Sequence, residues 1–316
     1  MMKEAMFYRK LSDDVVQCGL CNHFCAIKPG ERGVCGVREN ISGKLFSLVY
    51  GKAIADSVDP IEKKPLFHFL PGTLSYSVAT AGCNFSCLFC QNWEISQAPR
   101  TDGEVRGCEV SPEEIVERAI DAGCASIAYT YTEPTVFFEY AYDTAVIAHK
   151  KGLKNVFVSN GFMSKEAIDK IAPVLDGINV DLKGFSDEFY RKVVGGRLKP
   201  VLDNIRYLHE LGIWVEVTTL IVPGHNEDDA SLRKIAEFIA GVGVDVPWHV
   251  SRFFPHFRMK DVSLTPVDVL RRAYEIGKEE GIKYIYVGNV PGGGFESTVC
   301  PKCGKVVVER SGFEVS

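Results

Sequence analysis

The length, composition and charge of the chain exclude several classes of protein. Its 316 residues are 46% hydrophobic and 24% charged, with 36 Lys and Arg against 41 Asp and Glu, a formal net charge of −5. This acidic balance argues against a general nucleic-acid binder, and no apolar run approaches the roughly 20 residues of a membrane span. The N-terminal "MMKEAMFYRK" lacks the apolar core of a signal peptide. We therefore expect a cytoplasmic protein whose eleven cysteines bind metals or carry redox chemistry.

The N-terminal region, residues 1–70, differs in kind from the rest of the chain. It is rich in cysteine and then carries "GKLFSLVYGKAIADS" (43–57), which predicts a small β-meander. Four soft ligands within eighteen residues suit a closed tetrahedral zinc site or a further iron–sulfur cluster. These four, spaced C-x2-C-x3-C-x9-C, are Cys18, Cys21, Cys25 and Cys35.

Residues 71–290 alternate apolar β-rich runs with helical patterns. A helix is expected after each strand but the last, and the clearest has Ser111 as N-cap, Pro112 in its first turn and Gly123 at its end. Such alternation predicts an α/β fold with a parallel sheet. The pattern alone leaves both an open barrel and a doubly wound layer. The seven expected strands lie at 76–80, 126–130, 155–159, 177–182, 214–222, 248–253 and 284–288.

The first of these strands runs directly into a loop with three cysteines, "AGCNFSCLFCQNW". Cys83, Cys87 and Cys90 are spaced C-x3-C-x2-C, and no fourth cysteine follows for seventeen residues. Closed zinc and iron–sulfur sites usually take four protein ligands, so three thiolates on a cluster would leave one iron open to a small molecule. The loop also leaves the carboxyl end of a strand, where α/β folds build their sites. The alternative is a zinc knuckle completed by a distant thiol or histidine.

A resemblance favours the cluster over the zinc knuckle. The cysteine spacing, with Phe89 just before the last cysteine, resembles the cluster-binding motif of the radical S-adenosylmethionine enzymes. The resemblance implies a [4Fe–4S] cluster on the three cysteines, S-adenosylmethionine on the open iron, and a partial, open parallel β/α barrel. In that superfamily the reduced cluster cleaves the cosubstrate to a 5′-deoxyadenosyl radical, which removes a hydrogen atom from a substrate.

Longer segments resemble the AmmeMemoRadiSam family, which is akin to pyruvate formate-lyase activating enzymes. They are "CGLCNHFCAIKPGERGVCGVREN", "DPIEKKPLFHFLPG" and the terminal "CPKCG", so the resemblance covers nearly the whole chain. It implies a cytoplasmic, anaerobic oxidoreductase that receives electrons from a donor such as ferredoxin or flavodoxin. Its substrate, a protein glycyl residue or a small molecule, is left open by the sequence.

The resemblance also implies roles for polar residues that follow the second and third strands. In "YTYTEPT" Glu133 matches the glutamate that holds the amino group of the cosubstrate. The alternative for Glu133 is a carboxylate favoured by a helix N-terminus. In "VSNGF" Ser159 and Asn160 are expected to contact the ribose or the carboxylate of the cosubstrate.

Three further residues are expected to bind the cosubstrate. Asp181 and Lys183 alternate along the fourth strand and so point the same way, into the mouth of the barrel. Lys183 would pair with the cosubstrate carboxylate, and an ion pair with Asp181 is the alternative. His249, near the sixth strand, would lie near the adenosyl group, unless it is a buried core histidine.

The tail, residues 291–316, begins with a glycine-rich turn and continues as a hairpin that resembles a metal knuckle. Cys300 and Cys303 form a C-P-x-C-G half-site, which needs two further ligands. They could share a metal with Cys18 and Cys21, or the N-terminal four could close a site of their own. The sequence does not choose between these pairings.

Two other functions compete with a radical enzyme. A non-catalytic iron–sulfur electron-transfer protein would use every cysteine group as a cluster, but it would need no polar cradle at the strand ends. A zinc-based nucleic-acid module is disfavoured by the acidic balance. The sequence therefore predicts a radical enzyme that abstracts hydrogen, without partners among nucleic acids or membranes.

Overall fold

The computed structural model describes residues 2–290 and 294–316, which fall into two compact units. The first unit comprises the chain up to Asp59 together with Leu74–Ser86 and Asn92–Gly177. The second comprises Pro60–Thr73, Cys87–Gln91 and Ile178–Ser316. The three-cysteine loop is therefore divided, with Cys83 in the first unit and the other two cysteines in the second.

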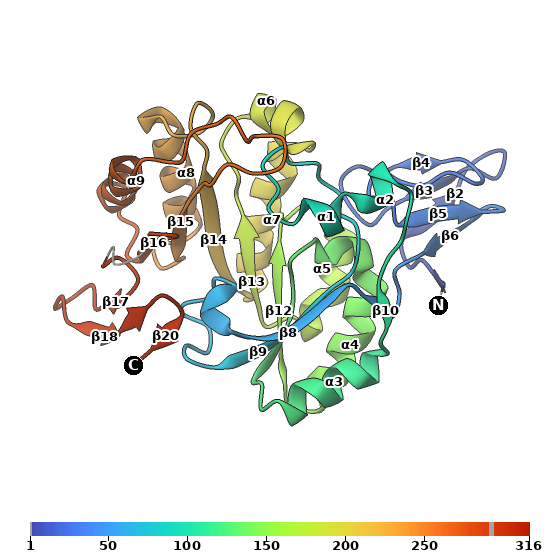
Figure 1. Cartoon of the computed structure of the whole chain (residues 1–316), viewed down its shortest axis with the longest axis horizontal. Coiled ribbons are helices and arrows are strands. Elements are labelled where there is room, and N and C mark those ends of the chain that lie inside the picture. The colour runs from blue at the N-terminus through green and yellow to red at the C-terminus, as the bar shows by residue number, and fades with distance from the viewer. Residues whose placement is uncertain (1, 291–293) are drawn as a thin grey trace. The chain divides into compact units, whose positions relative to one another are not determined.

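The first unit is built on strands in the order β12-β11-β9-β8 (Figure 1). The strand β9 lies parallel to β11, and β11 lies parallel to β12. Helices follow three of these strands in the chain, as βαβ units require. The bounds are β8 (Ala55–Pro60), β9 (Leu74–Ala79), β11 (Ser126–Tyr129), β12 (Lys154–Ser159), α3 (Pro112–Asp121), α4 (Phe138–Lys150) and α5 (Lys165–Ile171).

Helix α3 begins where the sequence predicts. The Ser111 hydroxyl accepts a hydrogen bond from the Glu114 N–H at 3.1 Å, and the Glu114 carboxylate accepts one from the Ser111 N–H at 2.6 Å. This capping box satisfies two N–H groups at the start of the helix. The buried face of α3, which includes Ile115 and Ala119, brings the helix against α4.

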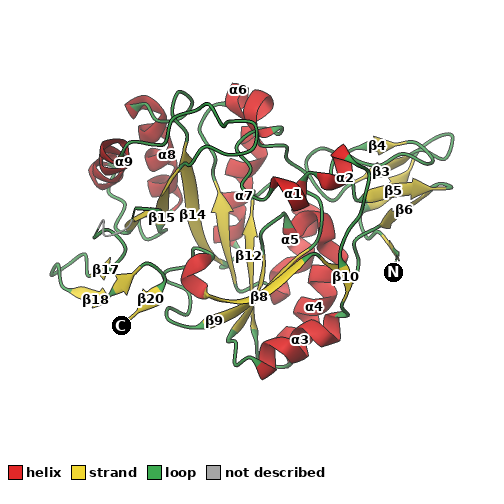
Figure 2. Cartoon of the chain, viewed as in Figure 1, coloured by secondary structure: helices red, strands yellow, loops and turns green. Residues whose placement is uncertain are grey.

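The N-terminal residues of the first unit form short antiparallel strands (Figure 2). One sheet has the order β1-β6-β5 and another the order β2-β3-β4, while β7 pairs with β10. A meander over 43–57 would pair consecutive strands, so the pairing of β7 with β10 departs from that prediction. The bounds are β1 (Lys3–Glu4), β2 (Tyr8–Lys10), β3 (Val16–Cys18), β4 (Ala26–Ile27), β5 (Arg38–Ile41), β6 (Lys44–Ser47), β7 (Lys52–Ala53) and β10 (Cys108–Glu109).

The second unit repeats the parallel arrangement, with strands in the order β16-β15-β14-β13. The strand β15 lies parallel to both β14 and β16, so that Trp248 is opposite Val217 and Ile285. The bounds are β13 (Gly177–Asp181), β14 (Trp214–Ile221), β15 (Trp248–Arg252), β16 (Ile285–Gly288), α7 (Leu198–Glu210), α8 (Asp229–Val242) and α9 (Val267–Glu279).

The seven strands predicted for residues 71–290 are confirmed, and their ends agree within two residues. The α/β class is confirmed with them. Several single turns were not predicted, because a helix of one turn has no repeating apolar period to detect. They include α1 (Trp93–Ser96), α2 (Ala98–Thr101), α6 (Asp187–Phe189) and a π-helical turn (Tyr190–Val194). The predicted glycine-rich turn falls on 291–293, outside the described residues.

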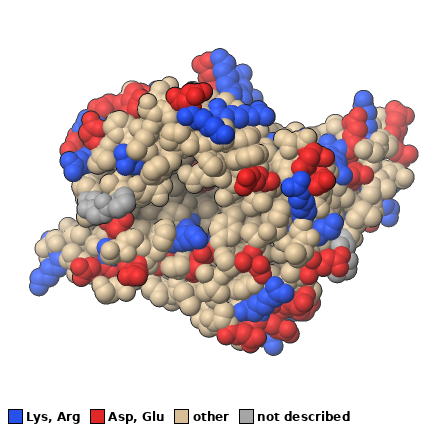
Figure 3. Space-filling view, in the orientation of Figure 1, with Lys and Arg blue, Asp and Glu red and all other residues tan. Residues whose placement is uncertain are grey.

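The described residues contain no helix that is both long and apolar enough to cross a membrane. On the face drawn in Figure 3, Lys and Arg are intermixed with Asp and Glu. Positive and negative charges are therefore mixed on this face, in keeping with the small formal net charge of −5.

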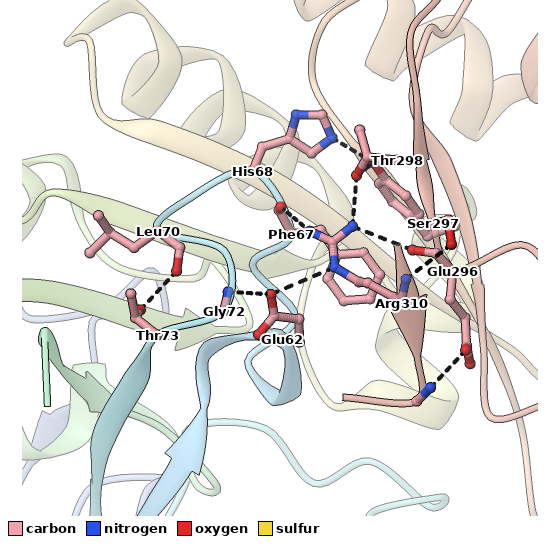
Figure 4. Close-up of polar contacts among 12 residues, drawn as sticks. Glu62, Phe67, His68, Leu70, Gly72, Thr73, Glu296, Ser297, Thr298 and Arg310 are labelled. Atoms are coloured by element: carbon pink, nitrogen blue, oxygen red, sulfur yellow. Dashed lines mark hydrogen bonds and ion pairs between the residues drawn. The ribbon is translucent and has the colours of Figure 1, made fainter. Parts of the chain in front are cut away.

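The tail of the second unit is anchored by Arg310, whose side chain is fully buried (Figure 4). Its guanidinium donates to the Thr298 hydroxyl and to the Phe67 carbonyl, both at 2.6 Å. It also lies 3.6 Å from the Glu62 carboxylate and 4.4 Å from the centroid of the Phe67 ring. A residue of the tail is thus tied to the segment Pro60–Thr73. The tail strands are β17 (Thr298–Val299), β18 (Val306–Val308), β19 (Arg310–Ser311) and β20 (Glu314–Val315).

We predict that Arg310→Met lowers the free energy of unfolding by about 3–5 kcal/mol, because removing one partner leaves the buried Glu62 carboxylate uncompensated. Chemical denaturation followed by circular dichroism measures the change. The matched control is Arg106→Met, since Arg106 is exposed and its ion pairs lie on the surface. Equal effects of the two substitutions would contradict the anchoring role.

Candidate functional site

The candidate site begins where β9 enters the cysteine loop. Gly82 has φ +98°, and a Cβ at this position would lie 2.7 Å from the Val37 side chain and 3.1 Å from the Cys35 carbonyl. Only glycine fits this turn without displacing its neighbours. The Cys83 sulfur accepts a hydrogen bond from the Phe85 N–H at 3.4 Å. Backbone geometry therefore fixes the first thiol of the loop.

The Glu133 carboxylate connects the loops that follow β11 and β12. Its Oε1 accepts from the Thr135 N–H at 3.0 Å, from the Thr135 hydroxyl at 2.5 Å and from the Ser159 hydroxyl at 2.8 Å. Its Oε2 accepts from the Asn160 N–H at 2.8 Å. Burial raises the pKa of Glu133, and the hydrogen bonds from Asn160, Thr135 and Ser159 oppose that rise. The network holds the ends of two neighbouring strands together.

The Asn160 side chain carries this network to Cys83. Its Nδ2 donates to the Asn84 side-chain oxygen at 2.7 Å and lies 3.9 Å from the Cys83 sulfur. The structure thus brings together four predicted site residues of the first unit, namely Cys83, Glu133, Ser159 and Asn160. Glu133 also caps the short helix that starts at Pro134, as the alternative interpretation expected.

The second unit gathers the other predicted residues of the loop and of the fourth strand. The Lys183 ammonium lies 2.9 Å from the Asp181 carboxylate and 5.9 Å from the centroid of the Phe89 ring. The Phe89 ring stacks on Phe189 with centroids 6.2 Å apart. The alternative ion pair between Asp181 and Lys183 is therefore present. Contact of either residue with a cosubstrate stays a prediction.

Charge and burial act together around Cys87. Burial raises the pKa of its thiol to about 12, while the Lys183 ammonium opposes that rise. Burial alone would lower the pKa of Lys183, but Asp181 and Cys87 raise it above its usual value. The half-buried ammonium thus offsets part of the cost of forming the thiolate, the form that a metal needs, since metal ligands must lose their proton.

His249 lies elsewhere in the second unit. It is the second residue of β15, at the amino end of the strand, and it is buried. Its Nε2 lies 2.6 Å from the Glu216 carboxylate, which also accepts the N–H groups of Phe67 and His68. The ring stacks on Tyr286. These contacts are those of a buried core histidine, the alternative considered for His249. Contact of His249 with the adenosyl group stays a prediction.

Two residues near Cys83 were missed in the sequence. The Asn84 carbonyl lies 2.8 Å from His23 Nε2, and the Arg100 guanidinium donates to the Cys83 carbonyl. Asn84 lies inside the quoted loop, next to a cysteine, and that position was the available signal. Arg100 lies on α2, a single turn that no apolar pattern predicts.

The structure also places the outer cysteines. The N-terminal four line one cavity of the first unit. Cys300 and Cys303 lie between β17 and β18 of the second unit, where the Cys300 N–H donates to the Lys305 carbonyl at 2.8 Å. Backbone hydrogen bonds at Cys303 and Lys302 lower the pKa of Cys300. The four N-terminal thiols therefore line one cavity, and the choice among the metal pairings stays a prediction.

The chain is similar to a protein family, to proteins of other organisms and to a solved structure. The family profile described as "Radical SAM superfamily" matches residues 77–239. An uncharacterised protein of Methanocaldococcus jannaschii is 51% identical over 98% of this chain and 92% of its own length. The pyruvate formate-lyase 1-activating enzyme of Escherichia coli is 27% identical over 51% of this chain and 67% of its own length. The structure of Streptococcus suis SuiB bound to S-adenosylmethionine is 15% identical, with TM-score 0.55, over 72% of this chain and 53% of that chain.

The Glu216 carboxylate generates a prediction about acid stability. Burial alone would raise its pKa, but the His249 hydrogen bond and charge lower it below its usual value. Its contribution to stability is therefore present above the unfolded pKa, near 4.5, and is lost as pH falls through the folded pKa. Glu216→Gln should cost about 2–4 kcal/mol of unfolding free energy at pH 7, and this deficit should shrink below pH 4.5.

Denaturation at a series of pH values measures this difference. The control is Glu210→Gln, because Glu210 is exposed near the end of α7. A deficit that stayed constant from neutral to acidic pH would show that Glu216 is not held ionised by His249.

Proposed function

Because the chain belongs to the Radical SAM superfamily, we propose that it cleaves S-adenosylmethionine reductively at a [4Fe–4S] cluster and uses the radical to abstract hydrogen from a substrate. The cluster would be held by Cys83, Cys87 and Cys90. It supplies one electron to the sulfonium and an iron without a protein ligand for the cosubstrate. The observation that carries the proposal is the C-x3-C-x2-C loop, which follows a parallel strand and whose first cysteine lies near the buried Asn160 amide.

The environment of the thiols fits cluster ligands. The Cys83 sulfur has N–H donors from Phe85 and from Asn160 nearby. Hydrogen bonds to cluster sulfurs and the charge near them set the reduction potential of such a cluster. Lys183 supplies a half-buried positive charge near Cys87, where negative charge on a thiolate would gather. These residues would stabilise the cluster and tune its potential.

The residues around the strand ends support a cosubstrate site. Lys183 would pair with the carboxylate of the cosubstrate and exchange part of its contact with Asp181 for it. Glu133 would act near the amino group, either directly or by fixing Ser159 and Asn160. The cosubstrate would thus bind against side chains that the fold already orders.

The substrate of the proposed radical is either a protein glycyl residue or a small molecule. The similarity to the pyruvate formate-lyase 1-activating enzyme supports a protein glycyl residue as hydrogen donor, and a small molecule remains the other candidate. The sequence resemblance to the AmmeMemoRadiSam family supports neither over the other. A low-potential protein such as ferredoxin or flavodoxin would supply the electron. A plain electron carrier is disfavoured, because it would need no ordered polar groups beside the cluster.

The first test is cosubstrate cleavage itself. After anaerobic reconstitution with iron and sulfide and reduction with dithionite, the protein should convert S-adenosylmethionine to 5′-deoxyadenosine. Cys87→Ala should abolish the product, because the cluster loses one of its three ligands. Chromatography with mass detection measures it, and Cys108→Ala is the control, since Cys108 is an exposed thiol on β10. Full activity of Cys87→Ala would overturn the assignment.

The second test concerns Glu133. We predict that Glu133→Gln leaves the absorbance of the cluster unchanged but weakens cosubstrate binding about tenfold or more, because charge-assisted hydrogen bonds contribute a few kcal/mol. Equilibrium binding to the reconstituted protein measures this. Glu166→Gln, on the exposed face of α5, is the control. Unchanged affinity would leave Glu133 with a purely structural role.

A further inference from the structure

The four N-terminal cysteines line one buried cavity of the first unit. Its other walls are mostly apolar, and they include Leu20, Ile27, Val34 and Val136. The cavity has a volume of about 20 Å³, whereas one water needs roughly 10–15 Å³ and several polar partners. Thiols in an apolar wall are poor partners for water and good ligands for soft metals. The lining cysteines are Cys18, Cys21, Cys25 and Cys35.

Two turns bring these thiols around the cavity. Cys18 ends β3, and its N–H donates to the Cys25 carbonyl at 2.9 Å, while the Phe24 N–H donates to the Cys21 carbonyl at 3.1 Å. In the second turn the Gly36 N–H donates to the Gly33 carbonyl at 2.9 Å, next to Cys35. Backbone hydrogen bonds therefore order both turns, the first with Cys18, Cys21 and Cys25 and the second with Cys35.

Arg38 provides a second, independent sign of a ligand. It lines the same cavity and is only 1% exposed. Its Nη2 donates to the Glu139 carboxylate, but its Nε and Nη1 have no hydrogen-bond partner among the described residues. A buried donor without a partner is costly, and thiolate or sulfide sulfur at the cavity would accept these N–H groups. The guanidinium would also offset part of the negative charge of four thiolates.

The geometry distinguishes a cluster from a single ion. Among residues 2–290 and 294–316, no three His, Cys, Asp or Glu side chains converge closely enough to hold one metal ion. A zinc ion bonded to four sulfurs at about 2.3 Å would leave no room between them for a water-sized sphere. A cluster of iron and sulfide keeps its cysteine ligands farther apart than a single ion does.

We propose that Cys18, Cys21, Cys25 and Cys35 bind a second [4Fe–4S] cluster, in which every iron has a protein ligand. Such a closed cluster offers no iron to a cosubstrate, so its chemistry differs from that of the cluster proposed on Cys83, Cys87 and Cys90. It adjoins the loop that carries Cys83, since His23 lines the cavity and contacts the Asn84 carbonyl at 2.8 Å. Binding would fix both the N-terminal strands and the start of that loop.

The test first removes the cysteines of the proposed catalytic cluster. The outcome of the test therefore does not depend on the proposed function. The variant Cys83→Ala/Cys87→Ala/Cys90→Ala is reconstituted anaerobically with ferrous iron and sulfide. It should retain about four irons and four sulfides per chain, where the wild type holds about eight of each. Native mass spectrometry and Mössbauer spectroscopy measure content and cluster type in both proteins. Adding Cys18→Ala/Cys21→Ala/Cys25→Ala, which leaves one of the four thiols, should remove the remaining iron, and adding Cys300→Ala/Cys303→Ala instead should not.

Circular dichroism of each variant shows whether the fold persists. If the triple variant does not fold, the iron count of the wild type decides, with about eight irons supporting a second cluster and about four overturning it. One zinc per chain with no iron in the folded triple variant would overturn the proposal. So would the absence of any bound metal, or loss of iron on removing Cys300 and Cys303.

Discussion

The buried Glu133 carboxylate is the interaction on which the first half of the site depends. It accepts from the loop that follows its own strand and from Ser159 and Asn160, which end the neighbouring strand. A buried carboxylate is tolerated only when hydrogen bonds satisfy it. That requirement locks the two strand ends together and aims the Asn160 amide at Asn84 and the Cys83 sulfur. A carboxylate fifty residues away in the sequence thus orders the Asn160 amide that lies 3.9 Å from the Cys83 sulfur.

The same principle of buried charge recurs around the other thiols. Lys183 lies near Cys87 and is balanced by Asp181, and Arg38 lines the four-cysteine cavity and is balanced by Glu139. A cation held near cysteines by an acidic partner favours thiolates and therefore metal binding. The protein repeats this pairing in both units, which is consistent with two places where sulfur carries negative charge.

Much of the fold was predictable because its signals are local. Buried parallel strands are continuous apolar runs, and the capping box at Ser111 fixes the start of α3. The partners of His249 and the pairing of β7 with β10 were not predictable, because both join segments far apart in the chain. Glu216 lies in an apolar strand, and the neighbouring sequence does not predict that two backbone N–H groups and a histidine contact its carboxylate. The sharing of one cavity by four thiols likewise depends on how two turns fold together.

In the proposed site, the iron left without a cysteine would bind the cosubstrate. Electron–nuclear double resonance on the reduced protein, with S-adenosylmethionine labelled at its amino nitrogen and carboxylate oxygen, tests it most directly. If the cosubstrate binds that iron, both labels show hyperfine coupling to the reduced cluster, and the coupling is lost in Cys87→Ala. A spectrum without either coupling, under conditions where binding is saturated, would contradict it.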